Sequence, residues 1–274
     1  MIRKSLIKAL EEKANYVRKE TLKIHKIAKD TRISSCLSDV EIFTVLYYGK
    51  ILRFNAKRPY CEERDRLIVS KAHGAVTLYP ILADLGFFKR ELLATVCKDG
   101  SLLGGIPDCS IPGFETINGS LGHGLGVGCG MAVALKRKKS FSKVFVVCGD
   151  GELYEGAVWE AVMFASHHRL DNLILIVDNN GRSMLGWCRD IIDLSPLRRK
   201  FEVFHWRVEV VDGHDVEQLY YVLKEFKNSK IDSPKVLIAN TIKGRGVASL
   251  EGDPLCHVKT LSDDEIDKYI YGNK

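Results

Sequence analysis

Two unbroken apolar runs near the middle of the chain predict buried strands. Residues 143–148 read KVFVVC and residues 173–177 read LILIV, and each run is followed by a polar turn. Unbroken apolar runs of this length are typical of strands that are buried on both faces of a parallel sheet. Further strands are expected within residues 64–74 and at residues 206–211 and 235–239.

Apolar positions at helical spacing lie between and before these strands. Residues 2–29 predict a charged amphipathic helix. After a polar break at residues 30–35, Ser38 is expected to cap a helix over residues 39–52, with Glu41 completing a capping box. Further helices are expected at residues 153–165, at residues 216–226 after a turn that ends in Asp215, and after Ser262.

The composition supports a globular α/β protein. The chain has 274 residues, of which 46% are hydrophobic, and this is enough for a substantial core. We therefore expect a mostly parallel sheet with helices on both faces, formed by residues 1–274 as a single domain. No apolar run approaches the ~20 residues that a membrane span needs. The N-terminal segment also lacks the continuous apolar core of a signal peptide.

Charge and cysteine content narrow the function classes. The net charge of +6 is modest, and the basic clusters at residues 136–139 and 198–200 fall at the ends of elements. We interpret them as solvated surface rather than as a nucleic-acid site. The eight cysteines show no close metal-type pairing, and several lie within apolar patterns. This usage indicates free thiols in a reducing cytoplasm.

Polar residues at the ends of two strands predict a ligand site. One strand is followed by Gly149-Asp150-Gly151, and the next by a turn that contains Asn179-Asn180. A right-handed crossover would bring both turns to the carboxyl edge of the sheet, where open α/β sheets bind ligands. The carboxylate of Asp150 and the amide oxygen of Asn180 are hard ligands that suit Mg²⁺ or Ca²⁺. The N-terminus of the helix that begins after Gly151 suits a phosphate. Taken alone, however, Gly-Asp-Gly is more simply explained as the turn of an ordinary strand–helix–strand unit.

The spacing of these two motifs resembles the fingerprint of thiamine-diphosphate enzymes. In that family the Asp, the second Asn and a backbone carbonyl two residues further on hold Mg²⁺ against the diphosphate. The resemblance therefore implies thiamine diphosphate and Mg²⁺ as cofactors, with Ca²⁺ as an alternative metal. The implied metal ligands are Asp150, Asn180 and the carbonyl of Arg182.

Other segments are similar to those of transketolases in particular. They are the helix start at residues 153–156, the strand–helix segment at 64–74, the glycine-rich loop at 116–124 and Leu255-Cys256-His257. The resemblance implies cofactor contacts by His73, Gly119, Leu121, Gly149, Asp150, Gly151, Glu152, Asn180 and His257. It implies catalytic roles for His73, His257 and Glu155, and it places Glu155 and Glu160 at an interface between subunits. Local sequence alone would instead place these two acids in surface salt bridges.

Two substrate-facing positions depart from the transketolase pattern. Where that family has two histidines that face the substrate, Arg32 and Ile106 are expected here. Ile106 cannot form side-chain hydrogen bonds, and Arg32 can only donate them. Because a guanidinium favours a carboxylate, a phosphate or another anionic group, these residues predict a modified or differently oriented sugar substrate.

The resemblance covers the chain almost from end to end, but only with the diphosphate-binding part of a transketolase. In that family another domain supplies the glutamate that activates the aminopyrimidine and the basic residues that bind sugar phosphates. We therefore expect a second polypeptide that carries the pyrimidine-binding domain, and a heterotetramer as the assembled enzyme. The predicted reaction transfers a two-carbon ketol unit from a ketose to an aldose in a specialised sugar pathway.

Two alternatives to this function remain open from the sequence. The chain could belong to a 2-oxoacid enzyme of the same fold, either as a deoxyxylulose-phosphate-synthase-like protein or as a dehydrogenase E1 subunit. It could also be a non-catalytic subunit that binds the cofactor or acts as a scaffold. Asp150, Asn180, His73 and His257 argue against the second alternative, whereas the two missing histidines keep it open.

Overall fold

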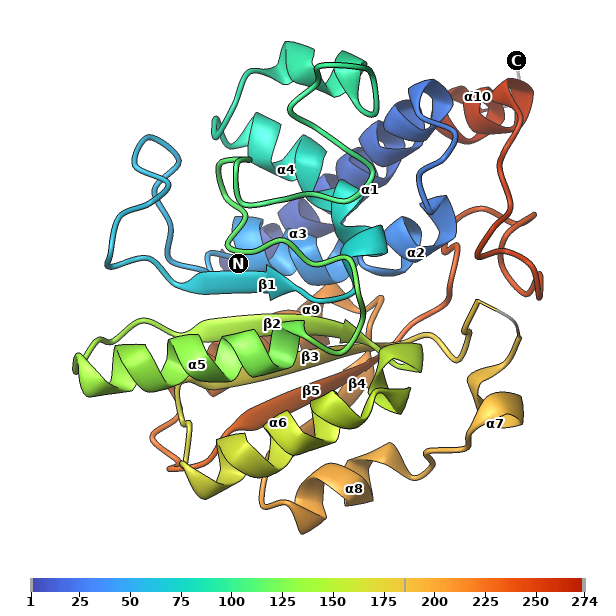
Figure 1. The fold of residues 1–274 in the computed structure, drawn as a ribbon. Coiled ribbons are helices and arrows are strands. Elements are labelled where there is room, and N and C mark those ends of the chain that lie inside the picture. Colours follow the sequence, from blue (N-terminus) through green and yellow to red (C-terminus); the bar gives the residue numbers. More distant parts are fainter. Residues whose placement is uncertain (1, 185, 273–274) are drawn as a thin grey trace.

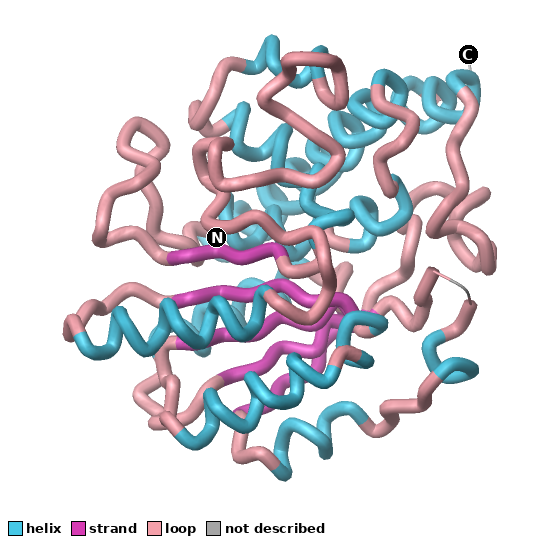
Figure 2. Tube along the Cα trace, in the orientation of Figure 1, coloured by secondary structure: helices cyan, strands magenta, loops and turns pink. Residues whose placement is uncertain are grey.

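The computed structural model describes residues 2–184 and 186–272. At its centre lies one five-stranded sheet in which all neighbouring strands are parallel (Figure 2). The spatial order is β1-β2-β3-β5-β4. The strands are β1 (Arg66–Val69), β2 (Val144–Gly149), β3 (Leu173–Asn179), β4 (Arg207–Asp212) and β5 (Lys235–Asn240). The five predicted strands and the α/β fold class are therefore confirmed.

The central strands send alternate side chains into two separate hydrophobic cores. Phe145 and Val147 of β2 belong to the core on one face of the sheet, and Val144 and Val146 belong to the core on the other. All four side chains are fully buried. Burial on both faces explains why these strands read as unbroken apolar runs rather than as alternating ones.

Helices cover both faces of the sheet (Figure 1). One core contains residues of α5 (Gly124–Arg137), α6 (Gly156–His167) and α8 (Leu197–Val203). The other contains residues of α1 (Ile2–Ile27), α2 (Ile33–Ser38), α3 (Val40–Tyr48), α4 (Leu78–Asp84), α9 (Val216–Asn228) and α10 (Asp263–Tyr271). The connections contain α7 (Cys188–Ile191) and the 3₁₀ turns η1 (Ala72–Thr77), η2 (Arg90–Thr95) and η3 (Gly151–Tyr154).

The capping box predicted at Ser38 and Glu41 is wrong. Ser38 is the last residue of α2, and its Oγ donates to the carboxylate of Asp178 at 2.7 Å. Glu41 pairs with Arg18 and accepts from Nδ1 of His214 at 2.9 Å. Both side chains are buried, so partners from distant parts of the chain replace the local capping bonds.

The caps predicted in the last third of the chain are confirmed. Asp215 accepts hydrogen bonds from two backbone amides at the start of α9, at 2.9 and 3.0 Å. Ser262 and Glu265 form a capping box at the start of α10. The polar break predicted at residues 30–35 is shorter than expected, because α2 already begins at Ile33.

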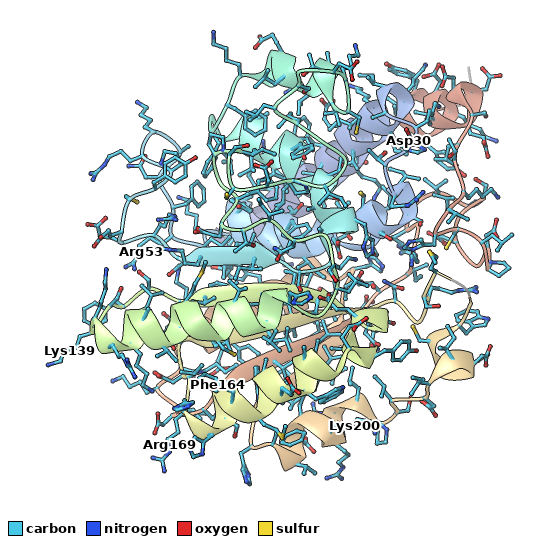
Figure 3. All side chains as sticks on the ribbon, in the orientation of Figure 1. Asp30, Arg53, Lys139, Phe164, Arg169 and Lys200 are labelled. Carbon is cyan, nitrogen blue, oxygen red and sulfur yellow. The ribbon has the colours of Figure 1, made fainter. Side chains whose placement is uncertain are left out.

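The carboxyl ends of the strands lie on the side of the molecule that carries α7 and the segment 241–262 (Figure 1). The basic cluster at residues 136–139 lies at the opposite end of the sheet, where Lys139 is labelled in Figure 3. There Lys136 pairs with Asp171 at 2.7 Å, as expected of solvated surface charge. No helix among residues 2–184 and 186–272 is long and apolar enough to cross a membrane.

Candidate active site

A cavity of about 490 Å³ opens at the carboxyl ends of β2 and β3. Its walls come from η1, the β2–η3 turn, the segment after β3 and the segment before α10, which lie far apart in the sequence. It gathers most of the residues predicted from the sequence: His73, Leu121, Gly149, Asp150, Gly151, Glu152, Glu155, Asn180, Arg182 and His257.

Four other predicted residues lie outside the cavity wall. Glu160 is exposed on α6, and Gly119 is exposed in the glycine-rich loop. Ile106 keeps 51% of its surface exposed. Arg32 is exposed at the start of α2, yet it is one of the cations whose charge acts on His257. The roles proposed for these four residues stay predictions.

Asp150 follows β2 directly, and two backbone amides hold its carboxylate. Oδ1 accepts from Gly151 at 2.8 Å, and Oδ2 accepts from Gly181. Burial raises the pKa of Asp150 to about 6, and the neighbouring carboxylate of Asp178 adds to this effect; the two amides and Lys243 oppose it. Because burial disfavours the charged form, a divalent cation at this position would stabilise the ionised carboxylate.

The other two predicted metal ligands lie next to Asp150 along the cavity wall. Nδ2 of Asn180 donates to Asp178 at 2.9 Å, and its Oδ1 accepts from the backbone amide of Arg182 at 3.1 Å. The bond to Asp178 fixes the orientation of the amide, so Oδ1 is the atom available to a metal. The carbonyl of Arg182 accepts from the ammonium of Lys243 at 3.0 Å.

His73 and His257 contact each other edge to face, with ring centroids 5.2 Å apart. Burial, assisted by Lys71, lowers the pKa of His73 to about 2, and burial, assisted by Lys243 and Arg32, lowers the pKa of His257 to about 4. Both imidazoles are therefore neutral at pH 7. Nδ1 of His257 is buried and has no hydrogen-bond partner among the described residues. A ligand in the cavity would supply the missing partner.

The carboxylate of Glu152 shapes the cavity wall. Its Oε1 accepts from the amide of Gly122 at 2.9 Å and from Oγ of Ser70, and its Oε2 accepts from the amide of Gly149 at 3.2 Å. These bonds hold the glycine-rich loop against the β2–η3 turn. The carboxylate therefore has a structural role, and the cofactor contact predicted for Glu152 stays a prediction.

A buried ion network lies against the same cavity wall. The ammonium of Lys71 contacts Oδ2 of Asp178 and, at 3.0 Å, Oδ1 of Asp39; none of these side chains is more than 2% exposed. Burial alone would raise the pKa of Asp178, but Lys71 holds it below its usual range. Burial raises the pKa of Asp39. Because Asp178 also binds Asn180, the network fixes a predicted metal ligand from behind.

The sequence did not predict several residues of the cavity wall, including Ser35, Lys71, Tyr154 and Lys243. A signal existed for Lys71, which is a charged residue inside an apolar strand–helix segment. Lysine is rarely buried without an acidic partner, so such a position predicts a buried ion pair. Lys243 lies in a Lys-Gly-Arg-Gly stretch that has the composition of a flexible surface loop, and no local signal distinguishes it.

The donor set fits one hard divalent cation and a diphosphate. Asp150, Asn180 and the carbonyl of Arg182 offer three oxygens of different types, and Mg²⁺ usually completes its octahedron with water and phosphate oxygens. Within the described part of the chain, no three His, Cys, Asp or Glu side chains form a metal site of their own. Lys243 and the two histidines add hydrogen-bond donors for phosphate oxygens.

Comparison with known proteins identifies the family. The profile of the domain described as "Transketolase, thiamine diphosphate binding domain" matches residues 11–272. The chain is 38% identical to a subunit of the apulose-4-phosphate transketolase of Actinobacillus succinogenes, covering 94% of this chain and 93% of that protein. It is 35% identical to the 6-deoxy-6-sulfo-D-fructose transketolase subunit SqwG of Clostridium sp., covering 93% and 92%.

Full-length transketolases match over the same region. Human transketolase is 36% identical across 96% of this chain, which spans only 42% of the human protein. The crystal structure of transketolase from Campylobacter jejuni superposes with a TM-score of 0.89 at 32% identity, covering 95% of this chain and 42% of that one. The chain therefore belongs to the family of the transketolase thiamine-diphosphate-binding domain.

Proposed function

We propose that this chain is the diphosphate-binding subunit of a split transketolase, with residues 1–274 forming one domain that binds thiamine diphosphate and Mg²⁺. The observation that carries the proposal is the convergence of Asp150, Asn180, Arg182, His73 and His257 on one cavity. The relatives named as transketolase subunits support it, since they match over more than nine tenths of their own lengths. The reaction is the transfer of a two-carbon ketol unit from a ketose to an aldose.

The residues of this chain bind and orient the reactants. Asp150, Asn180 and the carbonyl of Arg182 would hold the metal that accompanies the diphosphate. When bound, the cofactor supplies the carbanion chemistry that breaks and forms the carbon–carbon bond. The neutral imidazoles of His73 and His257 each offer one donor and one acceptor to a phosphate oxygen or a sugar hydroxyl.

A second polypeptide supplies the pyrimidine-binding domain and its activating glutamate, and the two chains assemble as a heterotetramer. The word "subunit" in the names of the similar proteins supports this arrangement. The surface of α6 also supports it: Glu160 is exposed there beside Met163 and Phe164, which are 48% and 43% exposed. Apolar surface bordered by charges is typical of an interface. The eight free cysteines are consistent with a cytoplasmic enzyme.

The purified chain alone is expected to show no ketol transfer, because the activating glutamate is expected on the partner. The measurement is a coupled assay of the chain alone, of the candidate partner alone and of the mixture, each with Mg²⁺ and thiamine diphosphate. Turnover should appear only in the mixture. Turnover by the chain alone would refute the split arrangement. Release of CO₂ from pyruvate by the mixture would favour a 2-oxoacid enzyme instead.

The substrate is proposed to be a ketose of a specialised pathway, since Arg32 and Ile106 stand where transketolases carry two histidines. A buried sugar hydroxyl left without a partner costs about 1–3 kcal/mol, or roughly ten- to hundredfold in rate. We therefore expect xylulose 5-phosphate and ribose 5-phosphate to be poor substrates of the reconstituted pair. Ketoses named for the relatives, apulose 4-phosphate and 6-deoxy-6-sulfofructose, form the comparison panel.

Substitution of Arg32 tests the same proposal from the side of the protein. Arg32→His restores a group that both donates and accepts, so it should raise kcat/KM for xylulose 5-phosphate relative to the panel. A kcat/KM on the order of 10⁴ M⁻¹s⁻¹ or better with xylulose 5-phosphate in the unsubstituted enzyme would show that the two replacements do not redirect specificity.

A further inference from the structure

The side chain of Arg182 is not explained by the role of its carbonyl. Its surface is only 5% exposed, and among the described residues no carboxylate lies within ion-pair distance of its guanidinium, although its charge acts at longer range on Asp253. A buried guanidinium without a carboxylate is unusual because burial penalises the charge. The contacts that replace a carboxylate here should therefore reveal what the side chain does.

Two groups contact the guanidinium, and they lie on different segments of the chain. Its central carbon lies 3.2 Å from the centre of the Trp187 ring, and its Nη2 donates to the carbonyl of Gly252 at 2.7 Å. Trp187 also pairs with Arg182 through an isolated antiparallel bridge of the backbone. We call this arrangement of Arg182, Trp187 and Gly252 the Arg182 bridge.

The Arg182 bridge joins two loops with different tasks in the site. One loop, the metal-binding loop at residues 180–184, carries the amide oxygen of Asn180 and the carbonyl of Arg182 that were assigned to the metal. The other, residues 252–257, leads into His257. The far end of this second loop has its own attachment, because Oγ of Ser34 donates to the carbonyl of Cys256 at 2.7 Å.

The geometry of the two attachments indicates how His257 is placed. Ser34 holds the residue next to His257, whereas Arg182 holds the start of the same loop against the metal-binding loop. With the Gly252 attachment removed, the loop would keep its bond to Ser34 at Cys256 and the ion pair of Asp253 with Lys259, but it would lose its hydrogen bond to the metal-binding loop. Nδ1 of His257, which is buried and unpaired, would then lose its fixed position beside His73.

We infer that Arg182 is a positioning residue: its guanidinium ties the metal-binding loop to the loop of His257 and so couples metal and diphosphate binding to the placement of that imidazole. The inference rests on the proposed function for the identity of the ligand. The Arg182 bridge itself is observed independently of that function. A stacked guanidinium is suited to this task because it binds a ring by its face and a carbonyl by its edge at the same time.

Hydrogen exchange of the 274-residue chain without ligand tests the Arg182 bridge directly. The probes are the amides of Asp253 and Cys256, which donate to the carbonyls of Leu250 and Asp253 at 3.2 Å each. In Arg182→Met we expect both amides to exchange about tenfold faster, since a hydrogen bond to a charged group is lost. Amides of β2 should exchange as in the unsubstituted chain. Equal acceleration throughout the chain, or none at residues 252–257, would overturn the inference.

Arg189→Met is the matched control. The guanidinium of Arg189 lies over the same indole ring at 5.2 Å, but its side chain is 72% exposed and pairs with Asp190. Its removal deletes a cation beside Trp187 but leaves the Arg182 bridge intact, so exchange at residues 252–257 should not change. If Arg182→Met fails to fold, Trp187→Leu removes the stacking partner instead and should accelerate the same amides.

A double-substitution cycle tests the coupling to His257. Calorimetry with Mg²⁺ and thiamine diphosphate should show weaker binding by about tenfold for Arg182→Met and no further loss when it is added to His257→Ala. Independent, multiplying losses would show that Arg182 does not act through His257. Failure of the reconstituted pair to bind the cofactor would refute the proposed function, while the exchange result would still decide whether the Arg182 bridge exists.

Discussion

Replacing Asp150 by alanine is expected to abolish binding of thiamine diphosphate and Mg²⁺ while leaving the fold intact. Asp150 is the only ionised side chain in the proposed metal set, so its loss should weaken binding at least about hundredfold. The fold should survive because the charged carboxylate is destabilised in the absence of a cation. Burial and the charge of Asp178 raise its pKa to about 6, so its removal deletes an unfavourable buried charge. Calorimetry and circular dichroism of the same sample would measure both effects.

Asp212→Ala provides the control for this experiment. Asp212 is also an aspartate at the carboxyl end of a strand of the same sheet, but it ends β4 and does not line the cavity. Its substitution should leave cofactor affinity unchanged. Binding by Asp150→Ala with the affinity of the unsubstituted chain would contradict the metal assignment.

Replacing Lys71 by methionine is expected to lower the free energy of unfolding by about 3–5 kcal/mol, because it leaves two buried carboxylates without a counter-charge. Lys71 is the cation shared by Asp178 and Asp39, and all three side chains are almost fully buried. Chemical denaturation at pH 7 would give the difference. Cofactor binding should also weaken, since Asp178 orients Asn180.

The pH dependence of this variant has a defined sign. Without Lys71, burial would raise the pKa of Asp178 above its unfolded value, as it already does that of Asp39, so the folded state would prefer both groups neutral. The deficit should therefore be largest at pH 7 and should narrow as the pH falls toward 4. A deficit that widens on acidification would contradict the ion network.

Lys235→Met is the matched control for Lys71. Lys235 is also fully buried, but among the described residues its ammonium donates only to the carbonyls of Asp171, Ile231 and Ser233. Burial lowers its pKa to about 8. Because the ammonium forms no direct ion pair and acts on Asp171 and Glu225 only at longer range, its loss should destabilise the chain much less than the loss of Lys71.

The sheet was predictable because its local signals agree with its environment. Strands β2 and β3 are buried on both faces, so nearly every position along them must be apolar, and this leaves an unbroken run in the sequence. The caps at Asp215 and Ser262 were predictable for a related reason. Their partners lie within three residues along the chain, so no distant group had to be known.

The residues of the site could be predicted only from backbone geometry and from resemblance to the family. Asp150 and Asn180 follow the ends of β2 and β3, and the carboxyl ends of parallel strands lie at the same edge of a sheet, so the two residues lie close together independently of their other contacts. The contacts of His73 and His257 were inferred from resemblance, and the structure places the two rings against each other. Their neutral state depends on burial and on Lys71 and Lys243, which the motifs do not encode.

The sequence by itself therefore determined the α/β class, the five strands, the caps at Asp215 and Ser262 and the place of Asp150 and Asn180 at one edge of the sheet. Only the tertiary structure decided the partners of buried polar groups. Ser38 donates to Asp178 instead of forming its predicted capping bond, and Lys71 pairs with two carboxylates from other segments. Arg182 donates to the distant carbonyl of Gly252. The physical reason is that a buried polar atom must find a partner, and packing brings close residues that are remote in the chain.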